Sequence, residues 1–234
     1  MTNAIITGAT KGMGRSIAIA FAKEGINLAV CSRNEKELAN FKQELLQINP
    51  QITVVTQVAD GSVKDQLLQF AGAAEQHLGF ISIIVNNLGM FAPSSILDES
   101  DTAFDQQLNT NLMPAYHLYR YFGKTMMAAR KGHIFTICSV AAINPIAEAG
   151  TYSVTKFALL GLSRVMRLEM MPYNVKVTAV IPGSTLTSSW EGTTIEKDKF
   201  VLPDDIASAI INTYKMSAGA NIDEIIIKPV GGQI

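Results

Sequence analysis

The chain has 234 residues and a formal net charge of −1, with 48% hydrophobic and 17% charged residues. This length suits one domain with a sizeable core, and the composition excludes a disordered chain. The near-neutral balance argues against nucleic acid as the main partner, because phosphate binding needs a basic surface.

No targeting or membrane segment is evident. The sequence has neither a basic region followed by a long apolar one nor an apolar run of membrane-spanning length. Cys31 and Cys138 lie in apolar, strand-like runs, which predicts buried free thiols in a reducing compartment. The three histidines are isolated, so we expect no metal site. We expect a soluble cytoplasmic protein that does not contact a membrane.

Strand and helix patterns alternate along the whole chain. Strands are predicted at 4–7, 28–32, 52–58, 81–85, 134–138, 175–181 and 225–228. Helices are predicted at 15–24, 35–48, 63–78, 102–129 with a kink at Pro114, 152–169, and from Pro203 onward. This alternation predicts a single α/β domain over residues 1–234. Its core would be a Rossmann-type doubly wound parallel sheet of about seven strands with helices on both faces.

A glycine-rich segment follows the first predicted strand. Thr7-Gly8 is followed by Gly12 and Gly14 at the start of the first helix. Glycines there let the backbone approach a phosphate, and the helix amino terminus favours negative charge. The spacing is not GxGxxG, and the alternative is a tight turn without a ligand. The position after the first strand favours a nucleotide site.

Ser32-Arg33 lies at the end of the second strand. An acidic residue here binds the ribose hydroxyls of NAD, whereas an arginine favours the 2′-phosphate of NADP. The acid is absent, and Arg33 and Lys11 supply two cations. NADP(H) is therefore favoured over NAD(H), although Arg33 could also be a solvated surface residue. Asp60, after the third strand, could bind an adenine amino group or could form a turn.

Tyr152 and Lys156 are four residues apart at the start of a predicted helix, so they share one face. A free tyrosine titrates near pH ~10, and about 4 kcal/mol is needed to bring it near neutrality. An ammonium ~4 Å away at an effective dielectric of ~20 supplies about that much. The same spacing also fits an ordinary amphipathic helix.

Six motifs in order resemble the short-chain dehydrogenase/reductase family in its single-domain form. They are Thr7-Gly-x-x-x-Gly-x-Gly14, Asn86-Asn87-x-Gly89, Asn111, Ser139, Tyr152-x-x-x-Lys156 and Pro182-Gly183. The resemblance covers nearly the whole chain, from Ala4 to Lys228.

The resemblance implies a catalytic group of four residues. Tyr152 would protonate the substrate carbonyl, and Lys156 would lower the pKa of Tyr152 and hold the nicotinamide ribose. Ser139 would hydrogen-bond the carbonyl, and Asn111 would hold a water behind Lys156. Alternatively, Ser139 is only a strand-end hydroxyl and Asn111 only a satisfied core amide.

The resemblance also implies the cofactor contacts. They are Gly8, Thr10, Lys11, Gly12, Met13, Gly14, Ser32, Arg33, Asp60, Asn87, Gly89, Tyr152, Lys156, Pro182, Gly183, Thr185 and Thr187. Three residues depart from the family pattern and bear on cofactor geometry. Leu88 replaces an alanine, Gly61 replaces an apolar residue, and Thr178 replaces an asparagine.

The loop at 184–202 is expected to cover the substrate. Trp190 in this loop could stack on a flat substrate or could anchor the loop. The segments 203–207 and 223–229 resemble the tail of carbonyl reductases near bacterial sepiapterin reductases, and Trp190 fits that group too. This resemblance implies NADPH-dependent reduction of a sepiapterin-like or other small ketone. The alternatives are a 3-oxoacyl-[acyl-carrier-protein] reductase and a non-catalytic NADP(H) sensor. By analogy with the family, we expect a homodimer or homotetramer.

Overall fold

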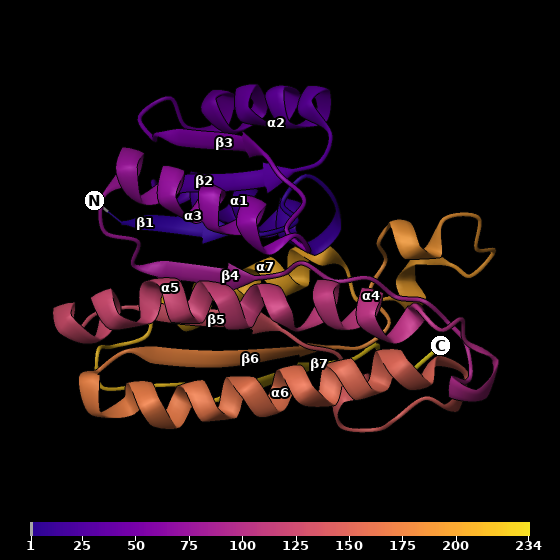
Figure 1. The fold of residues 1–234 in the computed structure, drawn as a ribbon. Coiled ribbons are helices and arrows are strands. Elements are labelled where there is room, and N and C mark those ends of the chain that lie inside the picture. The colour runs from indigo at the N-terminus through magenta and orange to yellow at the C-terminus, as the bar shows by residue number, and fades with distance from the viewer. Residues whose placement is uncertain (1) are drawn as a thin grey trace.

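A parallel β-sheet lies between two layers of helices in the computed structural model, which describes residues 2–234 (Figure 1). The strands are β1 Asn3–Ile6, β2 Asn27–Ser32, β3 Val54–Val58, β4 Ile83–Asn86, β5 His133–Ile137, β6 Lys176–Pro182 and β7 Glu224–Ile227. Their order is β3-β2-β1-β4-β5-β6-β7, and every neighbouring pair is parallel. The predicted doubly wound sheet of seven strands is confirmed.

Within residues 2–234, seven α-helices and six short 3₁₀ segments join the strands. The helices are α1 Gly12–Lys23, α2 Glu35–Ile48, α3 Lys64–Leu78, α4 Ala103–Asn111, α5 Met113–Ala129, α6 Gly150–Met170 and α7 Pro203–Tyr214. The 3₁₀ segments are η1 Ile96–Asp98, η2 Val140–Ala142, η3 Ala147–Ala149, η4 Met171–Tyr173, η5 Ser188–Trp190 and η6 Lys197–Lys199.

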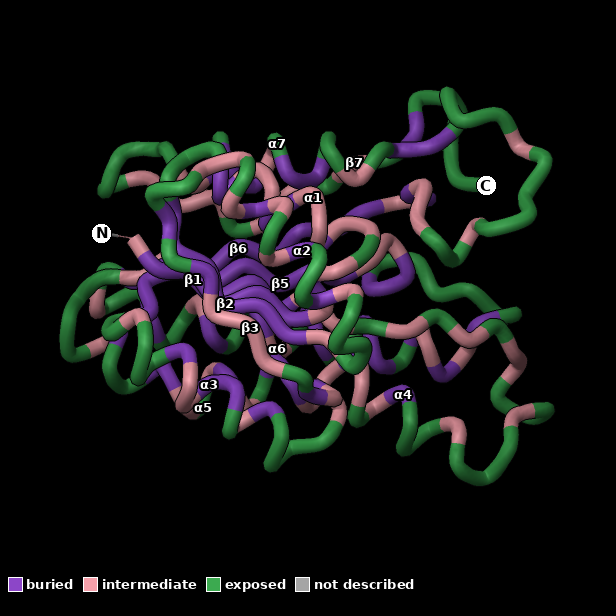
Figure 2. The backbone as a smooth tube through the Cα atoms, turned by 90° about the horizontal axis from the view of Figure 1, so that it is seen from above, coloured by how far each residue is buried: buried purple, intermediate pink, exposed green. Residues whose placement is uncertain are grey.

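Alternate residues of each strand enter two different cores. Ile6 packs with Phe21 on the face that α1, α2 and α7 cover. Ile5 packs with Phe70 and Phe122 on the face that α3, α5 and α6 cover. Burying each of these side chains stabilises the fold by about 1.5–3 kcal/mol. Figure 2 shows the result as a fully buried sheet centre surrounded by exposed loops and helix faces.

The predicted helix over 102–129 is divided in two. The backbone of Leu112 departs from α-helical geometry, with φ −117° and ψ −52°, and Pro114 follows in the first turn of α5. A proline has no N–H to continue the hydrogen-bond ladder, so the break falls two residues before it. The break leaves Asn111 as the last residue of α4.

The carboxyl ends of the strands carry the loops that matter for function. In open α/β sheets, ligands bind beyond these ends, where the strand order reverses. Here the reversal lies between β1 and β4. The loop at 184–202 and the carboxyl end of the chain also lie at the carboxyl ends of the strands (Figure 1). The two ends of that loop are joined by hydrogen bonds from Val201 N to Ser184 O (3.0 Å) and from Leu186 N to Val201 O (2.9 Å). Within residues 2–234, no helix is both long and apolar enough to span a bilayer.

Candidate active site

The glycine loop has a backbone that other residues would strain. Gly8 and Gly12 adopt positive φ values of 63° and 53°, a region that disfavours a Cβ atom. A Cβ on Gly14 would lie 2.3 Å from the carbonyl oxygen of Gly8. Asn87, after β4, donates from Nδ2 to the carbonyls of Thr7 and Gly8, at 2.9 Å each. The loop is therefore fixed between β1 and β4, facing the start of α1.

A cavity of about 690 Å³ holds the two predicted cations. Thr10, Lys11, Ser32 and Arg33 line it together with the first turn of α2. The Thr10 hydroxyl donates to Ser32 Oγ at 3.3 Å. Lys11 Nζ lies 3.0 Å from Glu37 Oε1, a carboxylate that the sequence reasoning missed. Lys11 and Arg33 therefore line one cavity, and Lys11 already pairs with the carboxylate of Glu37.

Asp60 makes the turn that was one of its two predicted roles. Its Oδ1 accepts hydrogen bonds from Ser62 N at 2.9 Å and Ser62 Oγ at 2.7 Å, while Oδ2 lies 3.9 Å from Arg33 Nη1. Burial opposes ionisation, but the bonds from Ser62 and the charge of Arg33 outweigh it and lower the pKa of Asp60. The contact with adenine stays a prediction.

Two of the three departures from the family pattern are adjacent in space. A Cβ on Gly61 would lie 2.8 Å from Leu88 Cδ2. The larger side chain at position 88 therefore occupies the space that a side chain at position 61 would need. The third departure, Thr178, lies within β6 and bonds to His133 and to Ile222 O. The expectation that Thr178 affects the cofactor geometry has no support, because Thr178 is buried between β5 and the segment before β7.

Ser139, Tyr152 and Lys156 come together where β5 ends and α6 begins. Ser139 and Tyr152 line a cavity of about 520 Å³, and Tyr152 and Lys156 line a neighbouring cleft of about 400 Å³ that reaches Gly8 and Gly12. Lys156 is buried, and its Nζ donates to Ile137 O at 3.1 Å and lies 5.7 Å from the centre of the Tyr152 ring. Tyr152 therefore stands on the wall that the cleft and the cavity share.

The Ser139 side chain also caps η2, two residues after the end of β5. Its Oγ accepts a hydrogen bond from Ala141 N at 3.1 Å. A hydroxyl that accepts one bond keeps its own hydrogen, so Ser139 can still donate to a ligand carbonyl in the cavity. Both predicted alternatives for Ser139 are thus compatible with one geometry.

Asn111 ties α4 to the loop after β4. Its Oδ1 accepts from Met90 N at 2.7 Å, and its Nδ2 donates to Met90 O at 3.1 Å and to Thr155 Oγ1 at 3.0 Å. The side chain is thus a satisfied buried amide, while its role beside a water stays a prediction. A Cβ on Gly89 would lie 3.4 Å from Lys156 Nζ and 3.5 Å from Asn111 Oδ1, so a glycine keeps this corner open.

The walls of the cavity of about 520 Å³ that Ser139 and Tyr152 line are mostly apolar. Phe91 meets the Tyr152 ring edge-on at 5.0 Å between ring centres. Trp190 lines the cavity and also packs edge-on against Phe200 at 4.9 Å, so it anchors the loop while it faces the cavity. Phe91 was missed because it lies in an irregular loop without a pattern.

The carboxyl-terminal tail forms another wall that sequence reasoning missed. Gln233 Oε1 accepts hydrogen bonds from Ser184 N at 2.9 Å and Ser184 Oγ at 3.1 Å, and Ile234 N donates to Ser184 Oγ at 3.2 Å. A Cβ on Gly183 would lie 2.2 Å from Gln233 Nε2. The tail at Gln233 and Ile234 thus packs against the start of the loop at 184–202, next to residues that are predicted to bind the nicotinamide.

Both cysteines are buried free thiols, as predicted. Burial raises the pKa of Cys31 and of Cys138 to about 12, which keeps them protonated and unreactive near neutral pH. Residues 2–234 contain no group of three or more His, Cys, Asp or Glu side chains that could hold a metal ion.

A glycine loop, a nearby pair of cations, and a tyrosine with a buried lysine define the site of a nucleotide-dependent oxidoreductase. The sequence model of the short chain dehydrogenase family matches residues 2–198, and the chain belongs to this family.

Known relatives and solved structures agree over nearly the full length. The sepiapterin reductase of Chlorobaculum tepidum is 31% identical over 98% of this chain and 97% of its own. An uncharacterized oxidoreductase of Staphylococcus epidermidis is 29% identical over 97% of this chain and 96% of its own. The alcohol dehydrogenase of the archaeon Thermococcus sibiricus, solved with 5-hydroxy-NADP, is 25% identical. It covers 100% of this chain and 99% of its own, with a TM-score of 0.92.

Proposed function

We propose that this enzyme uses NADPH to reduce a carbonyl group of a small substrate to an alcohol. The observation that carries the proposal is the position of Tyr152 on the wall between the glycine-loop cleft and the apolar cavity, with Lys156 buried behind it. A proton donor at that wall can reach a substrate in the cavity while the cleft holds the cofactor.

The residues of the cleft fit NADP(H). Gly8, Gly12 and Gly89 leave the backbone open to a ligand, and Lys11 and Arg33 lie where a 2′-phosphate needs positive charge. The archaeal alcohol dehydrogenase was solved with 5-hydroxy-NADP, and a metagenomic short-chain oxidoreductase, 26% identical, was solved with NADP. When bound, the cofactor supplies the hydride.

Two side chains of this chain act on the carbonyl oxygen, and a third acts through one of them. The Ser139 hydroxyl donates a hydrogen bond that polarises the carbonyl, and the Tyr152 hydroxyl donates the proton that completes the alcohol. The Lys156 ammonium stabilises the negative charge that remains on the Tyr152 oxygen, because it is buried and its attraction is little screened.

The substrate is proposed to be sepiapterin-like or another small ketone. The relative in Chlorobaculum tepidum named sepiapterin reductase supports this, at 31% identity. The alternative is a 3-oxoacyl-[acyl-carrier-protein] reductase. A reductase of that name from Brucella melitensis is 23% identical, which shows the fold alone. A non-catalytic NADP(H) sensor is a further alternative, against which the presence of Ser139, Tyr152 and Lys156 argues.

The function is tested by following NADPH oxidation over a panel of pteridines, diketones and oxoacyl thioesters. We expect turnover that Tyr152→Phe reduces by about 10²- to 10⁴-fold, because the proton donor is lost while the ring remains. The dissociation constant for NADPH should change by no more than a few fold.

The control is Tyr214→Phe, since Tyr214 bonds only to Thr2 at the far side of α7 in the described chain. Most activity retained in Tyr152→Phe would contradict the mechanism. Tight NADPH binding without turnover of any compound would favour the sensor.

We also propose that two copies pair through α6. Val154, Phe157, Val165 and Leu168 are 44–66% exposed and recur with helical spacing on one face of α6. Gly161 lies between them, with open space where a side chain would be, so a second helix could approach closely.

We place the protein in the cytoplasm, where the free thiols Cys31 and Cys138 stay reduced.

A further inference from the structure

The substrate cavity has an uneven charge. Among the described residues that line it there is no aspartate or glutamate side chain, and Lys228 is the one basic side chain. The remaining side chains are apolar groups, the amides of Asn144 and Gln233, and the hydroxyls of Ser139, Tyr152, Ser184, Thr185, Thr187 and Ser189. An apolar cavity with one convergent charged group has the composition of a specific ligand site.

Strand β7 brings Lys228 to the reacting end of the cavity. Ile227 pairs with Pro182 at the last position of the sheet, and Lys228 follows directly. Glu224, four residues earlier, is paired with Arg164 of α6 at 2.8 Å, so this face of β7 lies against α6. Residues 224 and 228 are an even number apart and face the same side in strand register. Helix α6 starts at the carboxyl ends of the strands, so Lys228 lies at the same end as Tyr152.

Lys228 is also available to a ligand. Arg164, Arg167 and Lys215 on neighbouring elements each have a carboxylate within 2.8 Å, whereas Lys228 has none within 4.0 Å in residues 2–234. It is exposed at the mouth of the cavity, where an ammonium remains hydrated until an anion approaches.

We propose that the substrate carries an anionic group, a carboxylate or a phosphate, that Lys228 binds while an apolar body fills the cavity. This inference rests on the proposed function and narrows its substrate class. A pterin ring presents amino and ring N–H donors, which a carboxylate would receive best, and no aspartate or glutamate side chain is among the described residues that line the cavity; the acceptors there are hydroxyls and the amides of Asn144 and Gln233. The geometry therefore favours an anionic ketone over a neutral pterin.

The test compares 4-oxo-4-phenylbutanoate with its methyl ester, two aryl ketones that differ in charge and by one methyl group. In the NADPH-loaded enzyme we expect a kcat/KM ratio of acid to ester that falls about five- to twentyfold in Lys228→Met, mainly through KM. Lys228→Glu should lower the ratio further, and Lys228→Arg should keep most of it. Raising the salt concentration from 0.05 to 0.5 M should reduce the wild-type preference, because the lysine is exposed.

The matched control is Lys131→Met, since Lys131 is exposed in the turn before β5 and does not line the cavity. An acid-to-ester ratio that is the same in the wild type and Lys228→Met would overturn the inference while the proposed reductase function stands.

A binding experiment separates the two proposals. Calorimetric titration of the enzyme–NADP⁺ complex with 4-phenylbutanoate, which cannot be reduced, should give an affinity that Lys228→Met weakens about fivefold or more. If this holds without turnover of any ketone, the reductase function fails and the anion site stands. If 4-phenylbutanoate binds equally well to both proteins, the anion site is wrong.

Discussion

Arg33 and Lys11 share a cavity, yet each already faces a carboxylate. Lys11 pairs with Glu37 at 3.0 Å, and Arg33 lies 3.9 Å from Asp60. Such exposed pairs are worth about 0–1 kcal/mol, so a phosphate with nearly two charges can compete for the cations. This balance bears on how strongly the enzyme distinguishes NADPH from NADH.

We predict that Arg33→Asp shifts the preference toward NADH. The substitution replaces a cation with an acid that repels the 2′-phosphate and can accept ribose hydroxyls. The dissociation constant for NADPH should rise about ten- to hundredfold, as measured by fluorescence titration of both cofactors. Lys42→Asp, an equal charge change at a half-buried position of α2 that does not line this cavity, serves as control. Unchanged selectivity in Arg33→Asp would count against the phosphate site.

Gly61 and Leu88 form a compensating pair. A Cβ on Gly61 would lie 2.8 Å from Leu88 Cδ2, the end of a flexible side chain, so we predict that Gly61→Ala lowers the free energy of unfolding by at most about 1 kcal/mol. Adding Leu88→Ala should recover part of this loss, because the clash disappears. Urea unfolding of the two single variants and the double variant measures the coupling. Strictly additive effects would show that the two positions are independent.

At the scale of elements, most of the fold was predictable because its signals are local. The apolar runs at 28–32 and 134–138 lie in strands buried on both faces, and parallel strands of this kind read as nearly continuous hydrophobic segments. The helix predicted at 102–129 was the main error. Pro114 predicted a kink, but the periodicity of apolar residues could not show that α4 ends at Asn111.

The missed parts of the site depend on contacts between distant residues. Ser184 and Gln233 are 49 residues apart, and neither the tail nor the loop has a periodic pattern that points to the other. The same holds for Glu37 opposite Lys11, since its position in the first turn of α2 is equally typical of a helix start. Tyr152, Lys156 and Ser139 could be singled out because the order of the motifs along the chain is distinctive, and their catalytic roles stay a prediction.

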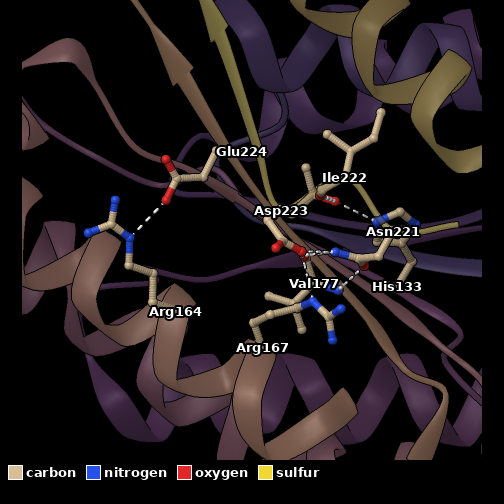
Figure 3. Close-up of polar contacts among 9 residues, drawn as sticks. His133, Arg164, Arg167, Val177, Asn221, Ile222, Asp223 and Glu224 are labelled. Atoms are coloured by element: carbon tan, nitrogen blue, oxygen red, sulfur yellow. Dashed lines mark hydrogen bonds and ion pairs between the residues drawn. The ribbon is translucent and has the colours of Figure 1, made fainter.

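A polar network joins β5, β6 and the segment before β7 at the edge of the sheet away from the active site. Figure 3 shows His133 beside Ile222, and Asn221 bonded to Val177. Arg167 of α6 contacts Asp223 in this segment, and Arg164 contacts Glu224, the first residue of β7. The Thr178 hydroxyl donates to Ile222 O at 2.7 Å, so it accepts from His133 Nε2 at 2.9 Å. This bonding makes Nε2 the protonated ring nitrogen, and Nδ1 has no hydrogen-bond partner in the described chain.

We predict that His133 makes the fold less stable in acid. Burial, aided by the charge of Lys176, lowers the pKa of His133 to about 3, compared with an ordinary value near ~6.5. Between these values the unfolded chain binds a proton that the folded chain does not. The free energy of unfolding therefore falls as the pH drops from about 6.5 to 3, by up to about 1.4 kcal/mol per pH unit.

Urea unfolding at several pH values checks this prediction against His133→Asn. The variant lacks the titrating group, so its stability should depend less steeply on pH over that window. Carboxylates contribute equally to both proteins and cancel in the comparison. Equal slopes for the two proteins would show that His133 is not the group responsible.

For the whole molecule, the exposed face of α6 determines the expected assembly. We predict a dimer in solution scattering and light scattering, and a monomer for the double variant Val165→Glu/Leu168→Glu. Charges buried at the centre of such an interface lack partners, so the dissociation constant should rise at least about 100-fold. Val63→Glu, an exposed valine at the start of α3, is the control. A wild-type monomer at micromolar concentration would contradict the proposed pairing.

The hydrogen bonds between the tail and Ser184 have a practical consequence for anyone who purifies this enzyme. Gln233 and Ile234 line the substrate cavity, so any residues added after Ile234 would extend from its wall. An affinity tag there would compete with the substrate for space or pull the tail away from Ser184. A tag placed ahead of β1 would instead leave from the opposite edge of the sheet (Figure 1), and kinetic constants should be measured on protein prepared in that way.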